Sequence, residues 1–343
     1  MKALVLEEYN KLVYKDVPAP EFKSNEVLVR VKACGICGSD VHGMDGSSGR
    51  RIPPIIMGHE ASGIIEQVGE EVMHWKPGDR VTFDSTIYPL NDWFTLKGMY
   101  NLSENRKVLG VSPGEYRQNG AFAEYVAIPE HILYRLPEKV DFVQAAMVEP
   151  VAVACHAIEL TKLSVQDTIT VIGAGMIGLF LIQVLSNSEA GQIIAVDIDD
   201  QKLGLARQFG ANLCLNPKNQ NIQKEIYRVT ENRGADVVFE AVGNTESLNL
   251  SISSVRKGGA VTLIGNLAAE VEFPLQSVVT RQIRVQGSCA IAGEYPMVLK
   301  MMQKGLIDIA PMLSATAPLS EGASWFKRLY DKEPGLYKVV LIP

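Results

Sequence analysis

The sequence predicts an α/β protein made of two differently built parts, and three observations support this. The chain has 343 residues, about twice a usual domain length, and 47% of them are hydrophobic, as in ordinary globular proteins. Up to about residue 150, short alternating segments are separated by turns. From about residue 151 to residue 286, apolar runs alternate with helical stretches, which predicts a parallel sheet with right-handed crossovers.

The first part is expected to be mostly β. In residues 26–33, Val27, Val29 and Val31 share one face of a predicted strand, and residues 77–83 contain another. In the second part, predicted strands at 168–172 and 192–199 alternate with predicted helices such as 201–210 and 222–230. From about Gly287 the sequence predicts helices at 295–304 and 325–330 and a closing strand, LYKVVLIP.

Charge and cysteine content narrow the class of partner. Lys and Arg total 33 against 39 Asp and Glu, so the chain has no basic excess for nucleic acid or an anionic membrane, and a small-molecule partner is favoured. Five cysteines are too few, and odd in number, for a disulfide framework, and we interpret them as reduced thiols or metal ligands. The start, MKALVLEEYN, lacks the long apolar region of a signal peptide, so we expect a cytoplasmic protein.

One uncharged stretch, residues 168–188, is long enough to span a bilayer. Its β-branched start and clustered glycines instead predict a buried strand, a tight turn and a helix. The turn has the spacing G-x-G-x-x-G. Gly173 would make the turn, Gly175 would let the backbone approach a pyrophosphate, and Gly178 would let the helix pack closely on the sheet.

The next predicted strand strengthens the interpretation as a dinucleotide site. Met176 and Ile177 open the helix whose free N–H groups would face the phosphates. Asp197 follows Gly178 by 19 residues, at the end of the strand. A carboxylate there accepts hydrogen bonds from the ribose hydroxyls and repels a 2′-phosphate, which favours NAD over NADP.

A second constellation, in the first part, indicates a metal site. It comprises CGICGSDVH from Cys34 to His42, His59-Glu60, and later Glu149. By spacing alone, Cys34 and Cys37 are also compatible with a redox pair or half of a four-cysteine site. A second C-x-x-C is absent, however, and thiolate, imidazole and carboxylate together form the mixed ligand set of a catalytic zinc.

The motifs CGICGSDVH, GHEASG, KPGDRV, GAFAEY and EPVAVACHA, followed by GAGMIG, resemble those of the medium-chain zinc-dependent alcohol dehydrogenase family, in particular its sorbitol and other polyol dehydrogenases. The resemblance runs over the whole chain, in the family's order. It implies a GroES-like catalytic domain at residues 1–151, a Rossmann domain that binds NAD at 152–286, and a segment at 287–343 that returns to the catalytic domain.

The resemblance also implies roles for single residues. Cys37, His59 and Glu60 would be zinc ligands, with Glu149 either a fourth ligand or the partner of a water on the metal. Cys34 would be structural, and Asp40 would orient His59. Ser39 would take the substrate's hydroxyl proton and His42 would pass it to solvent. The alternatives are that His42 is a surface histidine and that Glu149 stabilises a helix start.

The sequence departs from many relatives at the lobe that holds a second, structural zinc. Counted back from Gly98 and Asn101, the four cysteine positions are occupied by residues that supply no thiolate: Pro89, Asp92, Thr95 and Ser103. We therefore expect one zinc per chain. The side chains expected to pack the lobe instead are Trp93, Phe94, Leu96 and Tyr100.

The substrate end is less constrained by the motifs. The arginine that sorbitol dehydrogenases usually place after the last Rossmann strand is missing from residues 287–292. Arg50 and Arg51, in a loop between the Cys37 and His59 motifs, are candidates for binding a phosphate or carboxylate of the substrate, in a part that resembles galactitol-1-phosphate dehydrogenases. The alternative is a solvated basic turn.

The leading hypothesis is a zinc- and NAD-dependent dehydrogenase that oxidises a secondary alcohol of a polyol or polyol phosphate. The resemblance implies a homodimer or homotetramer, paired through Rossmann sheet edges near residues 260–285. A threonine-3-dehydrogenase-like or simple alcohol specificity is the second hypothesis. A non-catalytic dinucleotide-binding relative is the third, and the intact Cys37, His59, Glu60 and Ser39 argue against it.

Overall fold

The computed structural model describes residues 1–112, 117–188 and 190–343, and these form two compact units. The first unit comprises residues 1–149, 291–305 and 309–343, and the second comprises residues 150–290 and 306–308. The corresponding changes predicted from the sequence pattern are at residues 151 and 286. The fold class expected from the sequence, a mostly β part and an α/β part with a parallel sheet, is confirmed.

The first unit is built mainly from short strands. Its seven-stranded sheet has the order β10-β6-β5-β3-β18-β17, with β9 also paired to β3, and its three-stranded sheet has the order β2-β1-β4. The strands are β1 (Lys2–Glu8), β2 (Lys11–Asp16), β3 (Glu26–Gly35), β4 (Ile55–Ile56), β5 (Glu60–Val68), β6 (Arg80–Phe83), β7 (Thr86–Ile87), β8 (Lys107–Val108), β9 (Tyr125–Pro129), β10 (Leu133–Arg135), β17 (Leu313–Pro318) and β18 (Lys338–Ile342). Its helices are α1 (Gly38–Gly43), α2 (Phe142–Ala146), α9 (Tyr295–Gln303) and α10 (Gly322–Tyr330).

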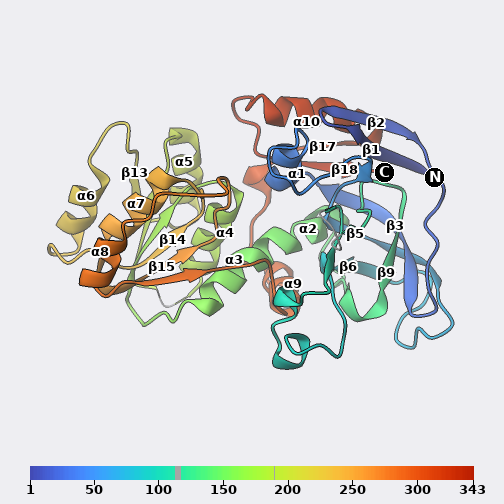
Figure 1. The fold of residues 1–343 in the computed structure, drawn as a ribbon, viewed down its shortest axis with the longest axis horizontal. Helices are drawn as coiled ribbons and strands as arrows, with labels where there is room; N and C mark the ends of the chain where they lie inside the picture. Colours follow the sequence, from blue (N-terminus) through green and yellow to red (C-terminus); the bar gives the residue numbers. More distant parts are fainter. Residues whose placement is uncertain (113–116, 189) are drawn as a thin grey trace. The chain divides into compact units, whose positions relative to one another are not determined.

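The closing strand completes the first unit. β18 pairs with β3 in antiparallel fashion, with Val340 opposite Gly35 and Leu341 opposite Cys34, and Figure 1 shows the end of the chain returning to these strands. The apolar run Val339 to Leu341 is buried, as are the facing positions of β3. β3 thereby becomes a central strand, and the loop that follows it is held on both sides.

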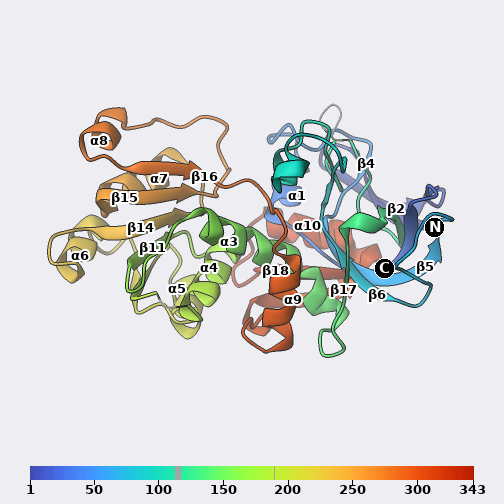
Figure 2. The same ribbon diagram turned by 90° about the horizontal axis from the view of Figure 1, so that it is seen from below.

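The second unit has a six-stranded parallel sheet in the order β13-β12-β11-β14-β15-β16, and Figure 2 shows β16, β15, β14 and β11 side by side in that order. β11 (TITVI) and β14 (ADVVFE) are buried at every position, which agrees with their mainly apolar and β-branched sequences. The strands are β11 (Thr168–Ile172), β12 (Gln192–Val196), β13 (Leu213–Leu215), β14 (Ala235–Glu240), β15 (Val255–Leu263) and β16 (Arg284–Gly287). The helices are α3 (Val148–Leu160, which starts at the end of the first unit), α4 (Met176–Ser186), α5 (Asp200–Gln208), α6 (Ile222–Val229), α7 (Thr245–Ser254) and α8 (Leu275–Thr280).

Residues 168–188 form β11, a glycine turn and α4, as the sequence predicts. Among the residues described, no helix has both the length and the apolar character needed to cross a membrane.

Candidate metal centre and dinucleotide site

Strand pairing brings three metal-ligand candidates together. β3 and β5 are antiparallel, with Gly35 opposite Glu60, so the turn after β3 that carries Cys37 lies against His59 and Glu60 at the start of β5. The ligand atoms of Cys37, His59 and Glu60 lie within 4.8 Å of one another. A Cβ on Gly35 would lie 2.4 Å from Glu60 Oε2, so this position has no room for a side chain. The three donors are of the types that bind zinc.

Asp40 lies behind the imidazole of His59. Its Oδ1 is 3.5 Å from His59 Nδ1, and both side chains are buried. Burial alone would raise the pKa of the Asp40 carboxyl, but the neighbouring His59 and Arg51 overcome this and hold that pKa well below its usual value. Asp40 therefore faces Nδ1, which makes no hydrogen bond among the residues described, and Nε2 is the nitrogen that would be available to a metal.

Ser39 lies beside the cysteine ligand on the first turn of α1. Its hydroxyl donates to Cys37 Sγ at 3.3 Å, and its backbone N–H also points at that sulfur, at 3.5 Å. Ser39 and His42 are both exposed and lie three residues apart on α1, so they share one helix face. Both side chains predicted to carry protons are thus accessible to solvent.

Lys338 is a residue of the site that sequence reasoning missed. It begins β18, and its Nζ forms an ion pair with Glu60 Oε2 and donates to the carbonyl of Ile36 at 2.9 Å. Burial lowers the pKa of Lys338, but the negative charges of Glu60 and Cys37 raise it by more, so the pKa lies above its usual value. A lysine opening the otherwise apolar strand KVVLI was the one available signal.

Glu149 is not one of the three grouped ligand candidates, but it lies near enough to His59 and Glu60 to interact with their charges. It is in the first turn of α3 and is buried. Burial raises the pKa of its carboxyl, as does the charge of Glu60, while His59 and Lys338 lower it. A carboxyl in this state holds a proton more readily than an ordinary glutamate does.

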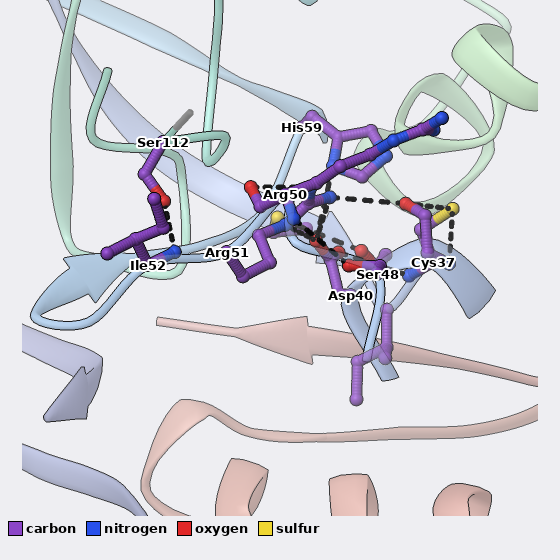
Figure 3. A network of polar contacts seen from close by, with 12 residues as sticks. Cys37, Asp40, Ser48, Arg50, Arg51, Ile52, His59 and Ser112 are labelled. Atoms are coloured by element: carbon purple, nitrogen blue, oxygen red, sulfur yellow. Dashed lines mark hydrogen bonds and ion pairs between the residues drawn. The ribbon is translucent and has the colours of Figure 1, made fainter. Parts of the chain in front are cut away.

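The two arginines predicted to contact substrate lie in different environments. Arg50 is exposed. Arg51 is not part of a solvated turn: it is buried, and its guanidinium is bound to Asp40 and to Ser39 Oγ (Figure 3). Only Arg50 therefore has the exposure that contact with a substrate anion requires. Cys34 is buried against Gly58, whereas Cys289 is exposed.

The glycine turn of the second unit has the geometry that its sequence predicts. Gly173 has φ 94°, and a Cβ there would lie 2.7 Å from the side chain of Val242. A Cβ on Gly178 would lie 1.8 Å from the carbonyl oxygen of Gly173. Gly175 is the N-cap of α4, and the half-buried Met176 and Ile177 form the first turn of that helix. The turn thus presents backbone N–H groups at a helix N-terminus, the geometry that binds phosphate.

Asp197 lies at the same edge of the sheet. Its carboxylate accepts hydrogen bonds from the backbone N–H of Ala174, at 2.7 Å, and of Asp199, at 2.9 Å. The first bond ties the end of β12 to the glycine turn. It also places a negative charge at the position where ribose hydroxyls bind in proteins with this motif.

The lobe that lacks cysteines is held by hydrogen bonds. Asp92 accepts from the backbone N–H of Thr95, at 2.7 Å, and from the hydroxyl of Ser103, so Asp92 links three of the four expected cysteine positions. Tyr100 is buried and stacks on Tyr88 at 4.1 Å. The expectation that Trp93 and Leu96 pack the lobe is wrong, since they are 64% and 73% exposed. A polar cluster has taken the place expected of an apolar one.

Together the fold and the two sites define a metal-dependent dehydrogenase that uses a dinucleotide, and the comparisons with known proteins agree. The alcohol dehydrogenase GroES-like domain family matches residues 23–138, and the zinc-binding dehydrogenase family matches residues 177–304. Sorbitol dehydrogenase of Bacillus subtilis is 30% identical, with 100% of this chain and 97% of that protein covered. D-arabitol-phosphate dehydrogenase of Enterococcus avium is 32% identical, with 94% and 92% covered. The chain belongs to the zinc-dependent medium-chain alcohol dehydrogenase family, among its polyol dehydrogenases.

Solved structures extend this result to the cofactor class. An alcohol dehydrogenase from Escherichia coli CFT073 in complex with NADH superposes with a TM-score of 0.92, at 27% identity, with 100% of this chain and 99% of that chain covered. A zinc-binding dehydrogenase from Sinorhizobium meliloti 1021 bound to NADP gives a TM-score of 0.90, at 30% identity and the same coverage. The protein is an oxidoreductase of a family that uses zinc and a nicotinamide cofactor.

Proposed function

We propose that this protein oxidises a secondary alcohol of a polyol or polyol phosphate with NAD, using one zinc ion per chain. The observation that carries the proposal is the convergence of Cys37, His59 and Glu60 beside Ser39, in a chain whose second unit has the glycine turn with Asp197. The named activities of the sorbitol and D-arabitol-phosphate dehydrogenases support the substrate class.

The chain's own residues supply binding and proton transfer. Cys37, His59 and Glu60 would hold zinc, with Glu149 available as a further carboxyl. When bound, zinc acidifies the alcohol and the nicotinamide accepts hydride from its carbon. Ser39 accepts the hydroxyl proton of the substrate on Oγ while its own proton, which is directed to Cys37 Sγ at rest, turns toward His42. His42 passes a proton to solvent, since both side chains are exposed on one face of α1.

The preference for NAD follows from charge. The Asp197 carboxylate would accept hydrogen bonds from both ribose hydroxyls and would repel the 2′-phosphate of NADP. No arginine stands beside it at positions 198–200 to bind that phosphate. We expect kcat/KM to be higher with NAD, and Asp197→Ala to reduce the difference.

The single zinc follows from the lobe around Asp92. Its hydrogen bonds with Thr95 and Ser103 occupy the positions that thiolates would need. Metal analysis of the purified protein should give one tightly held zinc per chain. Two tightly held ions would contradict this part of the proposal.

Assembly as a homodimer or homotetramer is also proposed. β16 is the edge strand of the parallel sheet, and the segment before it exposes five large apolar side chains: Leu267, Val271, Phe273, Leu275 and Val279. Such residues on an edge favour pairing with a second copy. Light scattering of the protein and of Leu275→Lys should show an oligomer in the first and a smaller species in the second.

The substrate is tested by a panel of polyols, polyol phosphates, threonine and simple alcohols, each with NAD and NADP. We expect the highest kcat/KM with a polyol or its phosphate, and Cys37→Ala to abolish turnover. If a phosphorylated polyol is preferred, Arg50→Gln should raise its KM with little change for the free polyol, because Arg50 is the exposed cation of that loop. Dinucleotide binding without turnover of any alcohol would overturn the proposal and favour a non-catalytic relative.

A further inference from the structure

Arg51 is a buried arginine whose guanidinium contacts two side chains next to the metal centre. Its Nε and Nη2 donate to Asp40 Oδ1 at 3.2 and 2.8 Å, and Nη2 also donates to Ser39 Oγ at 3.2 Å. Only 2% of the side chain is exposed, and Asp40 is fully buried. A single guanidinium therefore touches the carboxylate behind His59 and the hydroxyl beside Cys37.

The surrounding chain is shaped to hold this side chain. A Cβ on Gly43 would lie 2.3 Å from Arg51 Cγ, so α1 has a glycine where the arginine passes. Ser112 fixes the loop on either side of Arg51: its N–H donates to the Arg50 carbonyl at 3.1 Å, and its Oγ accepts from the N–H of Ile52 at 2.5 Å (Figure 3). Arg51 Nη1 donates to that same Arg50 carbonyl at 3.4 Å. The position of the guanidinium is thus determined at several points.

The chemistry of the guanidinium fixes the direction of the neighbouring hydrogen bonds. A guanidinium only donates, so Ser39 Oγ must accept from it and directs its own proton toward Cys37 Sγ, 3.3 Å away. Asp40 Oδ1 is likewise held in place by the guanidinium, 3.5 Å from His59 Nδ1. A lysine has one point of attachment and cannot bridge Asp40 and Ser39 in the same fork geometry.

We propose that Arg51 is a positioning residue of the metal centre, whose guanidinium orients two of the ligands, His59 through Asp40 and Cys37 through Ser39. This inference rests on the proposed zinc site at Cys37, His59 and Glu60. It assigns Arg51 to the ordering of the ligands and removes it from contact with substrate.

The test uses the full-length protein with Arg51→Lys and Arg51→Met. Zinc affinity is measured by competition with a chromophoric chelator, and the thiolate-to-metal absorption band is recorded after cobalt substitution. We expect Arg51→Met to weaken zinc binding by about 10- to 100-fold, as for other residues that orient metal ligands, and to shift the cobalt band. Arg51→Lys keeps a cation near Asp40 and loses the link to Ser39, so it should restore part of the affinity and leave the band shifted.

Two controls separate positioning from general loss of structure. Arg135→Met removes an arginine bound to Asp79 in the same unit and should change neither zinc affinity nor the cobalt band. Asp40→Asn combined with Arg51→Met leaves no unpaired buried charge, and the loss of zinc affinity caused by Arg51→Met should be smaller in that background. NAD affinity should stay constant in all variants, since the glycine turn lies in the second unit.

Wild-type zinc affinity and an unshifted cobalt band in both Arg51 variants would overturn the inference. So would additive losses in the Asp40→Asn background. Failure of the proposed function has a different signature: Cys37→Ala would then bind zinc as tightly as the wild type.

Discussion

Replacing Lys338 with methionine should destabilise the zinc-free first unit by about 3–5 kcal/mol. Methionine keeps most of the apolar stem and removes the charge that faces Glu60. Because Glu60 is 1% exposed, its carboxylate would remain buried without a cation, and the Ile36 carbonyl would lose a donor. Removing one member of a buried pair costs this much because the other charge is left without a partner.

An exposed ion pair in the same unit provides the matched control. Lys2 pairs with Asp16 at 2.7 Å, but their side chains are 42% and 77% exposed. Lys2→Met should therefore change stability by less than about 1 kcal/mol. The difference between the stability losses of Lys338→Met and Lys2→Met shows how much of the Lys338 effect comes from burial of the ion pair.

The assay is urea denaturation of metal-stripped protein, followed by tryptophan fluorescence. All three tryptophans, Trp75, Trp93 and Trp325, lie in the first unit, so the signal reports on that unit alone. Glu60→Gln added to Lys338→Met should recover much of the lost stability. Zinc should stabilise Lys338→Met more than the wild type, because the metal then meets a carboxylate with no competing cation. A Lys338→Met variant within about 1 kcal/mol of wild type, or a double variant no more stable than it, would refute the reasoning.

Three further predictions concern other parts of the chain. Burial raises the pKa of the Asp84 carboxyl to about 7 in the folded protein, so the stabilising effect of its bound proton is complete below about pH 4 and is lost as the pH rises to 7. In denaturation experiments at several pH values, Asp84→Asn should remove this pH dependence. At pH 8 the variant should be more stable than the wild type by up to about 4 kcal/mol. In a fluorescence titration, Gly178→Ala should weaken NADH binding more than tenfold, because its Cβ would clash with the carbonyl oxygen of Gly173. Gly204→Ala, whose Cβ would contact nothing, should bind NADH as the wild type does. Equal affinities of the two variants would show that the close approach of Gly178 to Gly173 does not matter for binding. Asp92→Ala should speed hydrogen exchange and proteolysis at residues 92–103, and unchanged protection would show that its hydrogen bonds do not hold the lobe.

The second unit could be predicted from sequence because its signals are local. β11 and β14 are buried on both faces and are therefore rich in apolar and β-branched residues on both faces. The glycine turn specifies its own geometry, since Gly178 must approach Gly173, and Asp197 follows at the end of the next strand. No long-range pairing has to be known to recognise this arrangement.

The metal centre was predictable only in part, because its parts meet through strand register. Cys37 and the His59-Glu60 pair could be named as candidates from residue type, but their approach depends on the β3–β5 register. Lys338 reaches Glu60 only because β18 adds to β3 on its other side, and no periodicity in the sequence encodes that pairing. Burial is equally hard to infer: Arg51 follows an exposed arginine in a loop and is buried, while Trp93 and Leu96 are apolar and exposed.

The two buried ion pairs at the metal centre have different relations to the metal, and this separates their expected effects. The Asp40 carboxylate, bound to Arg51, is not among the ligand atoms, so metal binding leaves that pair intact. Glu60 is both a ligand candidate and the partner of Lys338, so the metal and the ammonium compete for one carboxylate. Loss of Lys338 should therefore increase the stability that zinc adds to the protein. Loss of Arg51 should decrease the stability that zinc adds, because the ligands are then less well ordered to bind the ion.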